Sequence, residues 1–142
     1  MKILAITYNQ FKESTQKREF DDHKQYLRLQ KELREFYDEG KDFLFFYPRN
    51  LFNKKETEFI IFLKDGFVIV NKVENGYRYE QFYCKLVSKA LVRSKFNNLD
   101  HQLNLTFDNG KELIFNSLED SNHDWIDDYS ISIKELYKII SR

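Results

Sequence analysis

The fold is decided by a stretch that reads EFIIFLKDGFVIVNKVENGYRYEQFY from Glu58 to Tyr83 and LNLTFDNGKELIFNS from Leu103 to Ser117. Its short runs of β-branched and aromatic residues are separated by three turn signals, Asp65-Gly66, Asn75-Gly76 and Asp108-Asn109-Gly110. Each signal offers a glycine, which allows the positive φ that a tight hairpin needs. The flanking residues favour strands, so this stretch predicts an antiparallel meander.

Outward from these turns, the sequence predicts seven strands. The first is an almost wholly apolar run from Asp42 to Tyr47, which we expect to end at Pro48 because proline cannot continue a ladder. The other six are expected at about 58–64, 67–73, 77–84, 88–96, 101–107 and 111–116. Leu105 and Phe107 alternate cleanly with polar neighbours. A slip of one residue would expose the whole apolar set, so we expect both side chains in the core.

Residues 1–40 read as helical. Thr7 and Gln10 have the spacing of a capping box for a short first helix, and Asp21-Asp22 offers an N-cap for a second. The second helix carries an apolar stripe at helical spacing, made of Tyr26, Leu29, Leu33, Phe36 and Tyr37. We expect it to end at Gly40, a residue typical of the position just past a helix.

After the strands, an acidic loop is predicted over residues 118–130, with Trp125-Ile126 as an apolar anchor, and Leu51-Phe52 as an anchor in the loop 49–57. A last helix is expected from about Ser132, because Ser132 and Glu135 again have capping-box spacing. Its apolar stripe consists of Ile133, Leu136, Tyr137 and Ile140.

Composition limits the functional classes. The 142 residues fit one domain, and 23 basic against 23 acidic residues give no net charge. Binding to nucleic acid usually requires a basic excess, so we expect no nucleic-acid partner. Aromatic residues reach 17%, more than an average core needs.

The single cysteine, Cys84, excludes an internal disulfide and reads as a small apolar residue in a reducing compartment. No apolar run approaches the length of a membrane span, and the start of the chain does not resemble a signal peptide. We therefore expect a cytoplasmic protein without an integral membrane segment.

Seven antiparallel strands followed by an amphipathic helix is an order that resembles the pleckstrin-homology-like superfold, especially its bacterial members. The resemblance is carried by the strand–Gly66 turn–strand from Phe59 to Val70, the hairpin from Leu103 to Phe115, and the helix from Ile133 to Ile140. The chain is also similar to small uncharacterised proteins of low-GC Gram-positive bacteria.

The resemblance implies an α+β fold in which a partly open antiparallel barrel is closed by the C-terminal helix. Residues 1–40 would then form a helical extension, and residues 41–142 the barrel with its closing helix, as one compact unit. Such folds host many functions, and the resemblance favours binding over catalysis.

The strand 77–84 presents one candidate binding surface. Tyr77, Tyr79 and Tyr83 share one face of it, and an exposed aromatic face is typical of protein interfaces. Two alternatives stay open for these tyrosines. They could stack bases of a single strand, although a basic groove is missing, or pack along the barrel with their hydroxyls in water.

A second candidate surface is the loop after the first strand. Relatives that bind phosphoinositides carry clustered basic residues there, whereas this chain offers only Arg49, Lys54 and Lys55, with Lys64 on the next strand. The resemblance thus implies at most a weak anion or lipid-surface site, and contact with a membrane surface is the less favoured expectation.

The acidic loop is the only concentration of possible metal ligands, with Glu119, Asp120, His123, Asp124, Asp127 and Asp128. It lacks the spacing and the glycine of a calcium loop, and His123 has no second histidine or cysteine nearby for zinc. His23 and His101 are isolated and read as structural. We expect no metal, no cofactor and no catalytic residue, with a metal-assisted enzyme built on this loop as the last alternative.

Together these patterns favour a non-enzymatic protein-interaction or assembly module, whose partner is another protein or a second copy of the chain. The weak anion-binding module is the first alternative to it.

Overall fold

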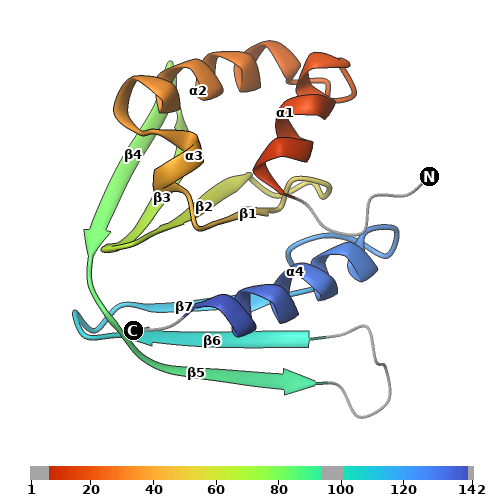
Figure 1. Cartoon of the computed structure of the whole chain (residues 1–142). Helices are drawn as coiled ribbons and strands as arrows, with labels where there is room; N and C mark the ends of the chain where they lie inside the picture. The colour runs from red at the N-terminus through yellow and green to blue at the C-terminus, as the bar shows by residue number, and fades with distance from the viewer. Residues whose placement is uncertain (1–6, 94–100, 141–142) are drawn as a thin grey trace.

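The computed structural model describes residues 7–93 and 101–140 (Figure 1). Its helices are α1 (Tyr8–Gln16), α2 (His23–Phe36), α3 (Glu39–Asp42) and α4 (Ile126–Ile139). Its strands are β1 (Phe45–Arg49), β2 (Glu58–Leu63), β3 (Gly66–Val73), β4 (Gly76–Tyr83), β5 (Leu86–Arg93), β6 (His101–Phe107) and β7 (Glu112–Asn116). None of these helices is long and apolar enough to cross a membrane.

The strands form two antiparallel sheets, one of four strands in the order β1-β2-β3-β4 and one of three in the order β5-β6-β7. The expected α+β class with seven antiparallel strands and helices at both ends is confirmed. Most predicted strand bounds agree within one or two residues. The predicted strand 88–96 begins earlier, at Leu86, and its residues 94–96 lie outside the described residues.

The first strand does not stop at Pro48. Pro48 lies inside β1 and is paired with Phe59 of β2. β1 is an edge strand, so the missing amide of the proline removes no ladder bond from a second neighbour.

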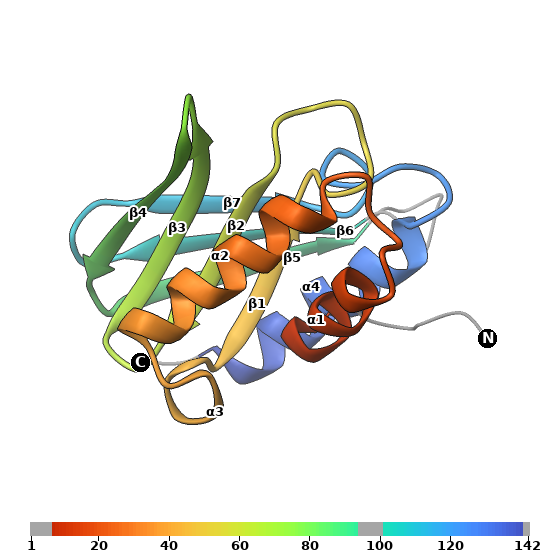
Figure 2. The same ribbon diagram turned by 90° about the horizontal axis from the view of Figure 1, so that it is seen from above.

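Helices α1 and α2 cover one face of the four-stranded sheet, and Figure 2 shows α2 lying across its strands. The ring of Phe11 on α1 lies 5.2 Å from that of Phe59, between ring centroids, and Tyr26 on α2 lies 5.7 Å from the same ring. Leu29 and Leu33 of α2 are buried in the same apolar core. The division of the chain at residue 40 stays a prediction, but the residues on both sides of it share one core.

The other face of the four-stranded sheet meets β6, β7 and α4. Phe67 packs 4.9 Å from Phe107, and Tyr47 packs 4.6 Å from Phe115, again between ring centroids. Leu105 and Phe107 are buried, as the alternation of their strand predicts. The two predicted loop anchors also meet, because Phe52 stacks on Trp125 with ring centroids 3.8 Å apart.

Two predicted helix ends are wrong. α2 ends at Phe36, and Gly40 lies in the separate helix α3, where its amide donates to the N-cap side chain of Asp38. α4 begins at Ile126 rather than near Ser132, so the predicted acidic loop supplies the first turns of this helix. Burial explains the early start, since Tyr129 packs against Tyr47 and is inaccessible to solvent. The capping box of Thr7 and Gln10 on α1 is confirmed.

The turn glycines differ in conformation. Gly66 and Gly110 have positive φ, as expected, whereas Gly76 is not among the positive-φ residues of the described chain. The turn at Gly66 requires glycine for a second reason, because an added Cβ would lie 1.8 Å from the Phe82 carbonyl oxygen.

Replacing Leu29 by alanine should lower the free energy of unfolding by about 2–5 kcal/mol, because this α2 side chain is fully buried against the sheet. The matched control is Leu27→Ala on the same helix, whose side chain is exposed and whose loss should cost less than about 0.5 kcal/mol. Urea unfolding of both variants measures the difference. Equal costs would show that α2 does not pack on the sheet in solution.

Candidate functional site

The tyrosine strand is mostly covered. Tyr79 donates a hydrogen bond to Glu32 of α2 at 2.5 Å, and its ring packs against Phe36. Tyr77 is half-buried, and burial raises its pKa above the ordinary value. Only Tyr83 of the three remains open, with 72% of its surface exposed. The structure therefore does not bring the three tyrosines together as an exposed aromatic patch.

Arg49 is engaged within the fold. Its guanidinium lies 3.1 Å from Glu58 Oε1, donates to the Ile114 carbonyl, and stacks over the Phe115 ring at 5.0 Å. Its Nε lies 3.4 Å from Asp120 Oδ1, which is the distance of an ion pair without hydrogen-bond geometry. With two carboxylates beside it, Arg49 offers little charge to an external anion.

Lys55 donates from Nζ to the Glu119 carbonyl at 3.0 Å, which ties the loop after β1 to the segment after β7. Lys54 and Lys55 line a small depression together with Lys72 and Glu56. The three predicted cations therefore do not converge on one site.

Asp120 is the centre of a buried polar cluster. Its Oδ2 accepts from the Tyr47 hydroxyl at 2.7 Å and from the Asn116 amide at 2.9 Å, and its carbonyl accepts from the Asn50 amide. Burial raises the pKa of Asp120, and the Arg49 guanidinium beside it opposes that shift. The cluster closes the end of β7 against the end of β1.

The remaining acidic residues do not form a metal site. Asp127 and Asp128 lie in the first turn of α4, where negative charge is favourable, while Asp120 points to Tyr47. Within residues 7–93 and 101–140, no three histidine, cysteine, aspartate or glutamate side chains lie close enough to hold a metal ion. The acidic-loop alternative thus finds no ligand group in this part of the chain.

His101 begins β6 and is buried. Its Nε2 lies 3.2 Å from Arg93 Nε and its Nδ1 lies 2.6 Å from Ser130 Oγ. Arg93 can only donate, so the neutral ring carries its proton on Nδ1 and donates to Ser130. These contacts join β5, β6 and α4, so His101 has a structural role.

An apolar groove of about 460 Å³ lies beside the link between β4 and β5. Figure 1 shows this link, where the chain passes from the four-stranded to the three-stranded sheet. We call this groove the end groove. Its principal apolar lining residues are Leu44, Phe45, Leu63, Leu86, Leu136 and Ile139. Lys64 and Lys85 are the charged residues that line it. Cys84 lies in its wall, where burial raises the pKa of the thiol.

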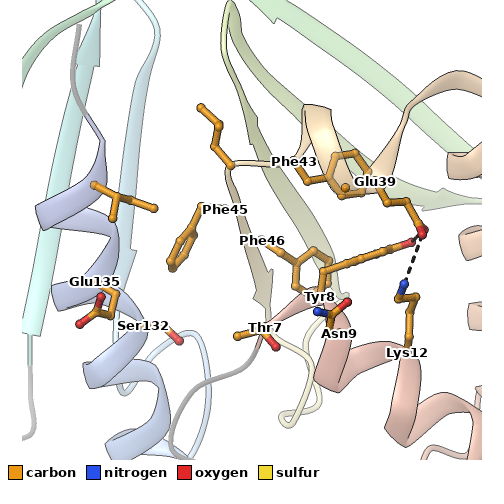
Figure 3. Close-up of a pocket in the computed structure, with 13 residues that line it drawn as sticks. Thr7, Tyr8, Asn9, Lys12, Glu39, Phe43, Phe45, Phe46, Ser132 and Glu135 are labelled. Carbon is orange, nitrogen blue, oxygen red and sulfur yellow. Dashed lines mark hydrogen bonds and ion pairs between the residues drawn. The ribbon is translucent and has the colours of Figure 1, made fainter.

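A second cleft of about 580 Å³ lies between α1, α3, the start of β1 and α4 (Figure 3). We call it the polar cleft. One wall carries Tyr8, Lys12 and Glu39, and the other carries Ser132 and Glu135 of α4. Lys12 lies 3.2 Å from Glu39, and Tyr8 donates to the same carboxylate at 2.5 Å. The two cavities share Leu44, Phe45 and Ile139, so α4 and the start of β1 form a continuous hollowed surface.

A family model described as "Protein of unknown function (DUF3908)" matches residues 5–130. The chain belongs to this family. No curated protein and no solved structure matches the chain. The matched range contains all seven strands and the N-terminal helices, so α1 and α2 are part of what the DUF3908 model describes.

Sequence reasoning missed both cavities of this DUF3908 protein. The apolar run before Pro48 reads as a buried strand, yet Leu44 is 58% exposed. A usable signal is present in α4, where Ser132, Glu135 and Ile139 follow one another at helical spacing on a stripe beside the apolar one. The stripe was not recognised, because Ser132 and Glu135 were interpreted as the capping box of a helix that begins at Ser132.

Replacing Tyr47 by phenylalanine should lower the free energy of unfolding by about 1–3 kcal/mol, because the buried Asp120 carboxylate loses a hydrogen-bond donor. Tyr83→Phe, at an exposed tyrosine, is the control and should be near neutral. Chemical unfolding of both variants gives the comparison, and equal stabilities would argue against the Tyr47–Asp120 contact.

Alkaline pH should unfold the protein cooperatively. Burial raises the pKa of seven tyrosines above 10.0, namely Tyr8, Tyr26, Tyr37, Tyr47, Tyr77, Tyr79 and Tyr129. Because the folded-state pKa is the higher one, their contribution to stability is complete below pH 10.0 and is lost as the pH rises above it. Melting temperature and tyrosinate absorbance, followed from about pH 9 to about pH 12, should change together. Ionisation of these tyrosines in a protein that stays folded would contradict the burial.

Proposed function

We propose that this protein is a non-enzymatic interaction module that binds a segment of another protein in the end groove. The observation that supports the proposal is an apolar groove whose lining includes the exposed residues Leu44 and Ile139 and whose charged lining residues are both lysines. The groove is concave and is lined by the start of β1, the β2–β3 turn, the β4–β5 link, the end of β6 and the end of α4.

Exposed apolar side chains concentrate at this end of the molecule. Leu44 and Ile139 lie on the mouth of the groove and are 58% and 47% exposed. Tyr83 and Val87, both exposed, flank the lining residues Cys84 and Leu86 along the chain. Exposed apolar residues are ordinary one at a time, whereas exposed apolar residues that line a groove, as Leu44 and Ile139 do, are typical of an interaction site.

The charge of the lining determines the chemistry of the partner. Lys64 and Lys85 are the two charged residues of the lining, and Asp108, which accepts a hydrogen bond from the Lys85 amide, is the acidic residue beside this wall. An acidic residue on the partner would therefore meet complementary charge, which favours correct partners and faster association. The occupant that fits is an extended segment with bulky aliphatic or aromatic side chains next to aspartate or glutamate.

The tyrosines of β4 differ in how much surface they offer to a partner. Tyr79 is hydrogen-bonded to Glu32 of α2 and Tyr77 is half-buried, so both offer less surface to a partner than Tyr83. Tyr83 lies one residue from the groove and can extend it. The anion-binding alternative has less support, because Arg49 is held between Glu58 and Asp120.

We also propose that the fold is of the pleckstrin-homology-like type. Two antiparallel sheets of four and three strands followed by a helix support a pleckstrin-homology-like, partly open barrel. We place the module in the cytoplasm on the sequence argument from its single cysteine, and its occurrence in low-GC Gram-positive bacteria rests on resemblance alone.

A peptide display selection on the full chain tests the function. Selected peptides should combine bulky apolar residues with adjacent aspartate or glutamate, and should bind the wild type in solution by calorimetry. Ile139→Gln should weaken their binding by about tenfold or more, as expected for the loss of a buried apolar contact. Enrichment of no peptide above background would overturn the proposal.

Ile114→Gln is a matched control for this experiment, because Ile114 and Ile139 are both 47% exposed but Ile114 lies on β7 away from the groove. The control should leave peptide affinity unchanged. A double variant, Lys64→Glu with Lys85→Glu, should weaken acidic peptides and leave neutral ones little changed. Light scattering completes the test, since a dimer that Ile139→Gln dissociates would mean that a second copy, rather than another protein, fills the groove.

A further inference from the structure

The polar cleft contains a buried hydroxyl that the described fold does not use. Ser132 is 2% exposed, and its Oγ has no hydrogen-bond partner within residues 7–93 and 101–140. Figure 3 shows this hydroxyl directed from α4 toward the side of the cleft where Thr7 lies. A buried hydroxyl without a partner is destabilising, and such groups are rare in folded proteins. Its position indicates that a ligand in the cleft supplies the missing hydrogen bond.

Glu135 places a carboxylate beside this hydroxyl. It lies three residues after Ser132 on α4, so both belong to the same side of the helix, and both line the cleft. Its ion pair with Lys138, at 3.3 Å, is between exposed side chains and is therefore weak. Because about half of its side chain is exposed, Glu135 can turn toward a cation in the cleft at little cost.

The opposite wall of the cleft already holds an ammonium group, that of Lys12. The Lys12 ammonium lies 3.2 Å from Glu39 Oε1 and 5.3 Å from the centre of the Tyr8 ring. A carboxylate with an aromatic ring is a favourable environment for a cation. Lys12 neutralises Glu39, so Glu135 leaves the charged lining of the cleft with one net negative charge.

The space between the two walls is apolar. Phe45 and Phe46 of β1 line it, and Figure 3 shows Phe45 on the side of α4 and Phe46 beside Tyr8. An aromatic body of a ligand can pack on these rings while its polar group reaches α4. The volume of about 580 Å³ is in the range of small-molecule sites.

We propose that the polar cleft binds a small primary amine carried on an aromatic body. Its ammonium donates one hydrogen bond to Ser132 Oγ and one to the Glu135 carboxylate, while the ring packs on Phe45. The polar groups of this site are distinct from the end groove, because Ser132 and Glu135 line the polar cleft and not the end groove, whereas Phe45 lines both.

Three probes of similar size separate the contribution of charge from that of the ring. Phenethylamine is a cation, phenethyl alcohol is neutral and hydrocinnamate is an anion. Titration of the full chain, followed by amide chemical shifts in NMR and by calorimetry, should show binding of the amine with shifts centred on α4 near Ser132. The alcohol and the anion should bind at least about tenfold more weakly. Equal or tighter binding of the anion would overturn the proposal, and so would the absence of amine binding.

Two variants test the named side chains. Glu135→Gln should weaken phenethylamine about tenfold or more, because it removes a charge-assisted hydrogen bond. Ser132→Ala should weaken the amine and, in the absence of ligand, should raise the melting temperature, because a buried polar group without a partner is removed. A purely structural serine would give a lower melting temperature, which contradicts the proposal.

Controls of the same chemistry lie elsewhere on the surface. Glu112→Gln on β7 and Ser88→Ala on β5 change exposed side chains that line neither cavity. Both should bind phenethylamine like the wild type. If Glu135→Gln and Ser132→Ala also bind like the wild type, the amine does not occupy the polar cleft and the assignment fails.

Discussion

The structure depends on the burial of β2 from both sides. Phe59, Ile60, Ile61 and Phe62 are four consecutive residues, and all of them are buried. Successive side chains of a strand point to opposite faces, so no single layer can bury four in a row. The chain must place one layer on each face of this strand. Helices α1 and α2 supply one, and β6, β7 and α4 supply the other.

This constraint explains why the tyrosines of β4 are not an exposed patch. Tyr79 lies opposite Val70 of β3, which lies opposite Phe59 of β2, so these side chains share the face that the helices cover. Covering Phe59 with α2 therefore also covers Tyr79, and its hydroxyl finds Glu32 on the helix. Tyr83 lies at the end of β4, near the end groove, and stays exposed. The aromatic excess in the composition is used mainly in the contacts between helices and sheet.

The sequence predicted those parts of the fold whose signals are local. The alternation of Leu103 to Phe107 and the glycine turns gave the strands and their pairing, because period and turn chemistry act over a few residues. What could not be predicted is which element covers each face, since that is decided by contacts distant in the chain, such as Phe11 with Phe59.

The candidate site was missed for a related physical reason. Ser132 followed by Glu135 satisfies the pattern of a helix start, but the helix begins at Ile126, where Asp127 and Asp128 favour the first turn and the burial of Tyr129 fixes it. Local pattern and tertiary packing thus disagree at α4. One stripe of this helix, with Tyr129, Ile133 and Leu136, is buried in the core.

The neighbouring stripe of α4 carries Ser132, Glu135 and Ile139 and lines the cavities instead. It contains a buried hydroxyl without a hydrogen-bond partner among the described residues, and an isoleucine that is 47% exposed. Buried polar groups without partners and exposed apolar side chains are concentrated at binding sites. Because both exceptions occur on one stripe of one helix, α4 combines two roles: Tyr129 and Ile133 pack in the core, whereas Ser132, Glu135 and Ile139 line the cavities.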